Sequence, residues 1–412
     1  MFFGWKVALA LLVILTFTSG LSFYNHAVFL DAFAKEGLFN LEDASLAVTI
    51  FFLSSGFAGL WIGKVIDRVD PRVLISIGAA LSCLALIGVR YSDALWQLYL
   101  SYSLFGAGFS AAGLLPATTL ITRWFVRRRA VALSVASTGL SLGGILVTPP
   151  CAALVEAWGL RAATPVFGLV FLIGIIPTAW LWLRPYPADM NLLPDGDKPI
   201  NEKPVTLETT LNTSSTKIAN GISYSDAKHQ RFFWGVSVSF ILLMLAQVGG
   251  IAHQYGLAKQ LLSETQTALA VAILPTASII GRLAGGWLIG LMSLRVFALN
   301  IMFLQVFALT LLATDYAPFT LCLGLACFGI TVGNLLMLQP LLIAEAFGPR
   351  DYAKIFSFAS LLSSWGTAAG PMVLGLAFSF SGSYGGAYWL AALAGLIGLI
   401  IFIWGGPLRR AN

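Results

Sequence analysis

The residue of this sequence with the most direct chemical meaning is Arg282. It lies in residues 268–291, an otherwise apolar stretch that is long enough to cross a lipid bilayer. A guanidinium stays protonated at biological pH and is costly to bury in lipid, so we expect it to face a water-filled cavity lined by protein. No Asp or Glu stands near the centre of any apolar stretch to neutralise it. The sequence therefore predicts that Arg282 holds an anionic ligand; the alternative is that it bridges helix carbonyls in a structural role.

Four further polar residues lie in apolar stretches and are candidates to line the same cavity: His253, Asn25, His26 and Asn334. A histidine titrates near neutral pH, so His253 could both bind an anion and carry a proton. His26 and Asn25 occupy a comparable place in the first apolar stretch, and Asn334 lies in the middle of a later one. The alternative for each of them is a hydrogen bond between packed helices.

The composition indicates where these residues sit. Hydrophobic residues make up 58% of the 412-residue chain and charged residues only 10%, whereas a soluble domain carries about 25% charged residues. Apolar stretches of about 20 residues recur along the chain, which is typical of a polytopic helical membrane protein. The sequence predicts an all-α membrane protein with twelve spans, at residues 7–30, 44–66, 72–90, 96–122, 130–156, 162–183, 232–257, 266–290, 296–313, 318–345, 353–379 and 384–405.

The Lys and Arg residues indicate how the spans are oriented. With both termini in the cytoplasm, thirteen basic residues fall in short cytoplasmic segments, and only four fall in outer loops, namely Lys35, Arg90, Arg161 and Lys259. Basic residues concentrate in cytoplasmic loops, so we expect cytoplasmic termini and a location in the plasma (cell inner) membrane. The net charge of +6 then reflects topology and contact with membrane lipid, and nucleic acid is not an expected partner.

The cysteines give no reason to expect a metal site or a disulfide. Cys83, Cys151, Cys322 and Cys327 all lie in predicted spans, and their spacing suits no common metal site. A Gly-rich phosphate loop or a catalytic set of Ser, His, Asp and Glu cannot be assembled from the few polar residues either. We expect no metal, no cofactor and no enzyme activity.

One segment interrupts the apolar pattern. Residues 185–230 are rich in Pro, Asn, Thr, Ser and charged residues and lack helical periodicity, which indicates a flexible cytoplasmic linker. We therefore expect an N-terminal six-helix bundle at residues 1–184, the linker at 185–230, and a C-terminal six-helix bundle at 231–412.

The loop after the second span contains a motif that recurs in part after the eighth span. It reads Gly63-x3-Asp67-Arg68-x3-Arg72, and the later copy keeps a Gly and an Arg at the same spacing. The motif resembles the loop signature of the major facilitator superfamily. This resemblance extends over almost the whole chain and implies two bundles that rock around a central cavity. It also implies that Asp67, Arg68 and Arg72 form a gate on the cytoplasmic side.

A second stretch resembles a narrower group of proteins. Residues 123–132 read RWFVRRRAVA and precede a span in which Gly139 and Gly143 are four residues apart. Together with Gly4-Trp5, these features resemble the monocarboxylate porters and the related oxalate–formate antiporters. Small residues let helix backbones approach closely. We expect the basic residues Arg127 and Arg128 to belong to the gate and to contact anionic lipid.

The narrower resemblance implies a role for Arg282. It occupies the position of the carboxylate anchor of the monocarboxylate porters, and its planar fork suits a carboxylate. Many animal members carry an Asp four residues earlier, thought to hold the coupled proton, where this chain has Ser278. His253 could carry the proton instead. The oxalate antiporters have a Lys in span eleven where this chain has Ala359 or Ser360, so a single cavity cation favours a monoanion.

These observations predict a secondary active transporter of small monocarboxylates, similar to lactate or pyruvate. We expect it to work as a monomer, by proton-coupled symport and alternating access. The alternatives are an exchanger of organic anions of the oxalate–formate kind, a porter for an unrelated solute such as a drug or sugar phosphate, and a transporter-like membrane sensor. A sensor would need binding motifs in the linker or a long soluble appendage, and neither is visible in the sequence.

Overall fold

The computed structural model describes residues 2–37, 39, 41–196, 221–314 and 317–408. Within these ranges, twelve helices are long and apolar enough to cross a membrane, and each coincides with a predicted span to within a few residues. The regular elements of the described part of the chain are all helical. The predicted all-α membrane fold with twelve spans is therefore confirmed. Most of the predicted linker, residues 197–220, lies outside the described residues.

The first six spans include three that are interrupted within their length. Their helices are α1 (Phe3–Thr18) with η1 (Ser19–Tyr24) and α2 (Asn25–Glu36), α3 (Leu41–Val65), α4 (Pro71–Arg90), α5 (Leu95–Ala112) with α6 (Leu114–Trp124), α7 (Arg129–Leu142) with η2 (Gly143–Val147) and α8 (Thr148–Trp158), and α9 (Leu160–Trp182).

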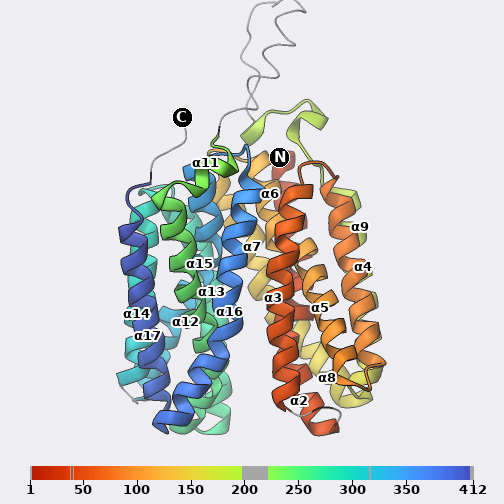
Figure 1. Cartoon of the computed structure of the whole chain (residues 1–412). Helices are drawn as coiled ribbons and strands as arrows, with labels where there is room; N and C mark the ends of the chain where they lie inside the picture. The colour runs from red at the N-terminus through yellow and green to blue at the C-terminus, as the bar shows by residue number, and fades with distance from the viewer. Residues whose placement is uncertain (1, 38, 40, 197–220, 315–316, 409–412) are drawn as a thin grey trace, which may run out of the picture.

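The last six spans are single helices. They are α12 (Arg231–Leu261), α13 (Glu264–Leu288), α14 (Leu294–Thr314), α15 (Pro318–Phe347), α16 (Tyr352–Ser381) and α17 (Tyr384–Trp404). Between the two sets lie the short helices η3 (Pro187–Met190), η4 (Pro194–Gly196) and α11 (Tyr224–Lys228). We call the end of the molecule at which α9 ends and α12 begins the linker end; it is the upper end in Figure 1.

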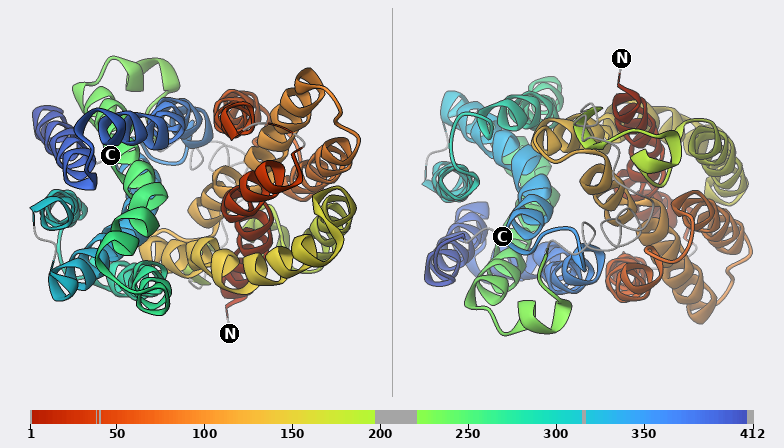
Figure 2. Two further views of the ribbon diagram at one scale, coloured as in Figure 1. Left: turned by 90° about the horizontal axis from the view of Figure 1, so that it is seen from below. Right: turned by 90° about the horizontal axis from the view of Figure 1, so that it is seen from above.

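The helices of the two halves pack in the same pattern. In the first half α1 packs against α7 and α9, and α4 packs against α5 and α9, while α3 packs against α5. In the second half α12 packs against α16 and α17, and α14 packs against α15 and α17, while α13 packs against α15. Each pair in one half thus has its counterpart six spans later, as an internal duplication requires. Figure 2 shows the two groups of helices side by side from both ends.

The halves meet along two pairs of helices, α3 with α16 and α7 with α13. Close approaches on these pairs lie toward the linker end. A Cβ on Gly63 of α3 would lie 2.7 Å from the carbonyl oxygen of Ala353, and one on Gly286 of α13 would lie 2.5 Å from Cβ of Ser134. In Figure 1, α3 and α16 diverge toward the opposite end.

Two π-helical turns, η1 and η2, face each other near the middle of the first half. A Cβ on Gly143 would lie 2.5 Å from both the Gly20 nitrogen and the Thr16 carbonyl oxygen, so only glycine allows this contact. The glycines spaced by four on span five therefore bring two backbones together, as small residues do in membrane helices. Single π-turns are common at functional sites because they change the direction of the side chains that follow them.

Candidate functional site: a cavity between the two halves

A cavity of about 200 Å³ lies between the two halves. Most of the exposed surface of its wall is apolar, and Arg282 is the charged residue among the lining residues. Its lining from the first half is Ser19, Phe23, Tyr24, Phe52, Ser55, Phe109, Leu114, Leu140 and Ser141. Its lining from the second half is Phe240, Met244, Gln247, Val248, Ile251, Arg282, Val332, Leu335, Leu336, Gln339, Phe356, Ser360, Ser363, Ser364 and Thr367.

Arg282 is fully buried and forms part of this wall. Its Nε donates a hydrogen bond to the carbonyl oxygen of Gly333 on α15 at 2.8 Å, and its Nη1 donates to the carbonyl of Ser137 on α7. Its Nη2 has no hydrogen-bond partner among the described residues. The guanidinium therefore bridges helix carbonyls of both halves, as the structural alternative proposed, and still keeps a donor free for a ligand.

The charge of Arg282 has no carboxylate beside it in the cavity. The lining residues, which all belong to the described part of the chain, include no Asp or Glu. Tyr24 and Ser141 belong to the same wall. The hydroxyl of Ser141 is hydrogen-bonded to that of Ser278 at 3.2 Å. A small anion in the cavity would meet a single positive group, and a buried charge without a partner is unfavourable.

A polar stripe on α16 forms another part of the cavity wall. Ser360, Ser363, Ser364 and Thr367 are three, four and seven residues apart, which places them on one helix face. Ser363 Oγ accepts a hydrogen bond of 2.7 Å from Gln339 Nε2. This spacing is readable in the sequence and could have been used to predict the stripe.

His253 does not line the cavity. It lies on α12 toward the end opposite the linker, is partly exposed, and donates from Nε2 to the carbonyl of Pro371 on α16 at 3.0 Å. A carbonyl can only accept, which fixes the proton on Nε2 and leaves Nδ1 as the basic nitrogen. The structure thus separates His253 from Arg282, with which the sequence grouped it.

Asn25 and His26 are buried within the first half and do not line the cavity either. The His26 ring packs edge-on against Phe51, with centroids 4.4 Å apart, and stacks on Tyr102 at 5.7 Å. Neither the imidazole of His26 nor the carboxamide of Asn25 has a hydrogen-bond partner among the described residues. Tyr24, the last residue of η1, thus lines the cavity, whereas the next two residues lie in the bundle interior.

Asn334 bonds two helices together. Its Nδ2 donates to the carbonyl oxygens of Gly281 on α13 and Ile330 on α15, both at 2.9 Å. It is buried and is not part of the cavity wall. Its geometry is that of the packing alternative considered for membrane amides.

The predicted gate residues lie at the linker end but are not one cluster. Asp67 pairs with Arg123 on α6, with 2.8 Å between Oδ1 and Nη2, and the same Nη2 donates to the carbonyl of Ile66. Arg68 is exposed. Arg72 pairs with Asp70 instead, with 2.6 Å between Nη2 and Oδ2.

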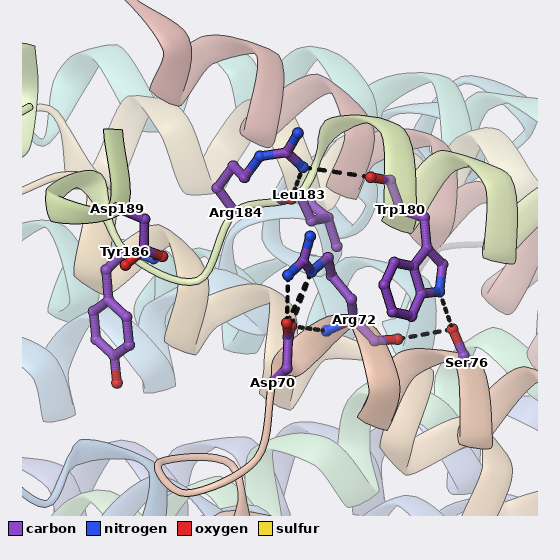
Figure 3. Close-up of polar contacts among 8 residues, drawn as sticks. All are labelled: Asp70, Arg72, Ser76, Trp180, Leu183, Arg184, Tyr186 and Asp189. Carbon is purple, nitrogen blue, oxygen red and sulfur yellow. Dashed lines mark hydrogen bonds and ion pairs between the residues drawn. The ribbon is translucent and has the colours of Figure 1, made fainter. Parts of the chain in front are cut away.

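Asp70 is the N-cap of α4, as Figure 3 shows. Its Oδ1 accepts from the backbone N–H of Arg72 at 2.8 Å, and the Arg72 side chain also lies over the ring of Trp180 at 5.1 Å. Partial burial of the Asp70 carboxyl opposes its ionisation. The hydrogen bonds and charge of Arg72 outweigh that effect and hold the pKa of Asp70 below its usual value.

The exposed side chains of Arg127 and Arg128 lie in the turn before α7. Their backbone N–H groups donate to Asp195 at 2.8 and 3.2 Å, and the N–H of Val126 donates to the same carboxylate at 3.0 Å. The Asp195 side chain is only 2% exposed. The beginning of the predicted linker is therefore fastened to the start of α7, a contact that no pattern in the sequence predicts.

Comparison with known proteins identifies the family. A family model described as Major Facilitator Superfamily matches residues 12–259. Monocarboxylate transporter 2 of Mus musculus is 22% identical over 393 residues, which cover 92% of this chain and 79% of the mouse protein. Membrane sensor protein UhpC of Salmonella typhimurium is 26% identical over 260 residues, 61% of this chain and 56% of the sensor. The crystal structure of the Escherichia coli fucose:proton symporter FucP superposes with a TM-score of 0.67 and 14% identity, over 98% of both chains. The family match spans more than half of the chain, and with the fold it shows that this chain belongs to the Major Facilitator Superfamily of membrane transporters.

Proposed function

We propose that this protein is a secondary active transporter of small monocarboxylates, similar to lactate or pyruvate, with Arg282 as the carboxylate anchor. One observation carries the proposal: the Nη2 of a buried arginine has no partner in a cavity whose lining contains no Asp or Glu. A monoanion would neutralise the single charge, whereas a dianion would leave an excess negative charge in an apolar enclosure.

The cavity wall and one of the relatives support a small organic acid as the substrate. Side chains such as Phe52, Val248 and Leu335 suit a short alkyl group beside the carboxylate. The similarity to a mouse monocarboxylate transporter supports the same substrate class. The sugar-phosphate alternative is less suited to this cavity, because a phosphate group usually requires two or more cations.

We propose that transport proceeds by alternating access, with the linker end and both termini in the cytoplasm and the protein in the plasma membrane. The close approaches of α3 to α16 and of α7 to α13 then form a closed cytoplasmic side. Asp67 and Arg123 hold the loop after α3 at that side. Opening it requires these contacts to separate while others form at the opposite end.

Proton coupling is the further part of this proposal, with His253 as proton carrier. The Nδ1 of His253 can take up a proton without breaking the bond from Nε2 to Pro371 on α16. Protonation would thus add a charge at the contact between α12 and α16. His253→Gln should leave binding of the acid intact and remove the dependence of uptake on external pH.

The test is uptake by the purified full-length chain in liposomes, measured with a series of labelled C2–C6 carboxylates. We expect saturable uptake of monocarboxylates that is stimulated by acid outside. An uptake rate that does not change with pH would overturn symport. Counterflow into vesicles preloaded with unlabelled acid separates exchange of organic anions from symport.

A membrane sensor is the second candidate, favoured by the similarity to Membrane sensor protein UhpC. A sensor would bind the acid in the same cavity without moving it across the membrane. Saturable binding with no uptake in the liposome assay would favour the sensor over the transporter.

A further inference from the structure

The polar atoms of the cavity wall divide into those with partners and those without. Among the lining residues, which are all described, two carry a buried side-chain atom that lacks any hydrogen-bond partner: Arg282 at Nη2 and Gln247 at Oε1. Gln247 lies on α12 and is 2% exposed. A buried polar atom without a partner is rare and unfavourable. This wall therefore has an unused donor and an unused acceptor.

Several other polar groups of the wall are already used within the protein. Ser19 donates to the carbonyl of Leu140 at 2.8 Å, and Ser364 donates to the carbonyl of Leu361 at 2.7 Å. Gln339, the other amide of the wall, donates to Ser363. Gln339 is thus held by its neighbours, whereas the carboxamide of Gln247 is not.

We propose that Gln247 is a second ligand contact, which accepts a hydrogen bond from a hydroxyl group on the bound anion. The transported acids would then be hydroxy monocarboxylates in preference to unsubstituted ones. This inference rests on the proposed function, because it assumes that Arg282 binds the carboxylate. It adds a preference among monocarboxylates that the guanidinium alone cannot provide.

The charge of the cavity wall indicates which hydrogen-bond donor on the ligand would bind favourably. An ammonium group, as in an amino acid, would add a second positive charge near the Arg282 guanidinium. The carboxylate of the ligand would balance only one of these charges, and the described lining includes no carboxylate for the other. A hydroxyl donates the same hydrogen bond without a charge. A keto group has only acceptor atoms, so it can bond Gln247 only through the Nε2 donor, which leaves Oε1 buried without a partner.

The test uses four acids of equal carbon number: butyrate, 2-oxobutyrate, 2-hydroxybutyrate and 3-hydroxybutyrate. Their dissociation constants are measured on the purified full-length chain by calorimetry. We expect at least one hydroxybutyrate to bind about tenfold more tightly than butyrate, the size expected for one net hydrogen bond. The 2-oxo acid should bind less tightly than the preferred hydroxybutyrate, because only the hydroxyl gives Oε1 a partner.

Gln247→Leu should bring the hydroxy acid to the affinity of butyrate while leaving butyrate within twofold of its original value. Gln247→Met provides the same readout if the leucine variant does not fold. The matched control is Gln305→Leu, because Gln305 is a buried amide of α14 outside the cavity wall that donates to the carbonyl of Leu243 at 3.1 Å. This control should keep the tenfold preference.

Three results would overturn the inference: equal binding of butyrate and both hydroxybutyrates, binding of the 2-oxo acid as tight as that of the preferred hydroxybutyrate, or a preference that survives in folded Gln247 variants. In each of these cases the acids still bind, so the carboxylate proposal stands. If folded wild-type protein binds none of the four acids, both proposals fall.

Discussion

The hydroxyl of Ser134 on α7 donates a hydrogen bond of 2.7 Å to the backbone carbonyl of Arg282 on α13. One turn farther along α7, the carbonyl of Ser137 accepts a bond from the Arg282 side chain. Arg282, whose charge faces the cavity, thus also connects the two halves through hydrogen bonds. Any movement of α7 against α13 must change the surroundings of the guanidinium, which links anion binding to the relative position of the halves.

The ion pair of Asp67 and Arg123 should favour the state that is closed at the linker end. Asp67→Asn should raise the population open at that end by at most about fivefold, because Asp67 is 41% exposed and such pairs contribute less than about 1 kcal/mol. The measurement is the alkylation rate of a Ser360→Cys reporter in the cavity wall, with reagent added on the linker side. Protein without the reporter gives the background from the native cysteines.

Asp93→Asn is the control for this experiment. Asp93 pairs with Arg161 at 2.7 Å at the opposite end of the first half. Its loss should leave linker-side alkylation unchanged. An equal increase of the alkylation rate in both variants would mean that the ion pair of Asp67 and Arg123 does not favour the state closed at the linker end.

Asp195→Ala should lower the free energy of unfolding by about 1–2 kcal/mol, because three backbone N–H groups before α7 lose their acceptor. Reversible denaturation in mixed micelles measures the change. Asp189→Ala is the matched control, since Asp189 is an exposed carboxylate that accepts from one N–H, that of Tyr186. A loss for Asp195→Ala no larger than for Asp189→Ala would contradict the role of Asp195 as an anchor of α7.

The carboxylate of Asp70 should make stability depend on pH. Its pKa in the folded protein is lower than in the unfolded chain, where it is about 3.9. The stabilisation is therefore fully present above pH 4 to 5 and is lost as the pH falls through the lower, folded-state pKa. Asp70→Asn keeps a capping oxygen but not the charge that pairs with Arg72.

The wild type should accordingly be more stable than Asp70→Asn at pH 7, and the difference should shrink as the pH falls below about 4. Thermal unfolding of both proteins across this pH range is the measurement. A difference that is constant with pH would show that the pair with Arg72 does not depend on ionisation of Asp70.

The twelve spans and the position of Arg282 in a cavity followed from the sequence, because apolar length and an unpaired intramembrane charge are strong signals. The side to which Asn25 and His26 point could not be predicted from the sequence, because the π-turn η1 interrupts the regular helix just before them. The place of Gln247 in the cavity wall did not follow either, because the side of a helix that faces a cavity cannot be read without the neighbouring helices. The division into domains at residues 184 and 230 and the site roles of individual residues stay predictions.

The central claim is that Arg282 binds a carboxylate, and the most direct measurement is the dissociation constant of lactate or pyruvate for three purified proteins. These are the wild type, Arg282→Ala and Arg90→Ala, in which an exposed arginine far from the cavity is removed. We expect Arg90→Ala to bind like the wild type. We expect Arg282→Ala to bind about 10- to 100-fold more weakly while remaining folded, because a charged hydrogen-bond partner of the anion is lost. Wild-type affinity in folded Arg282→Ala would contradict the account.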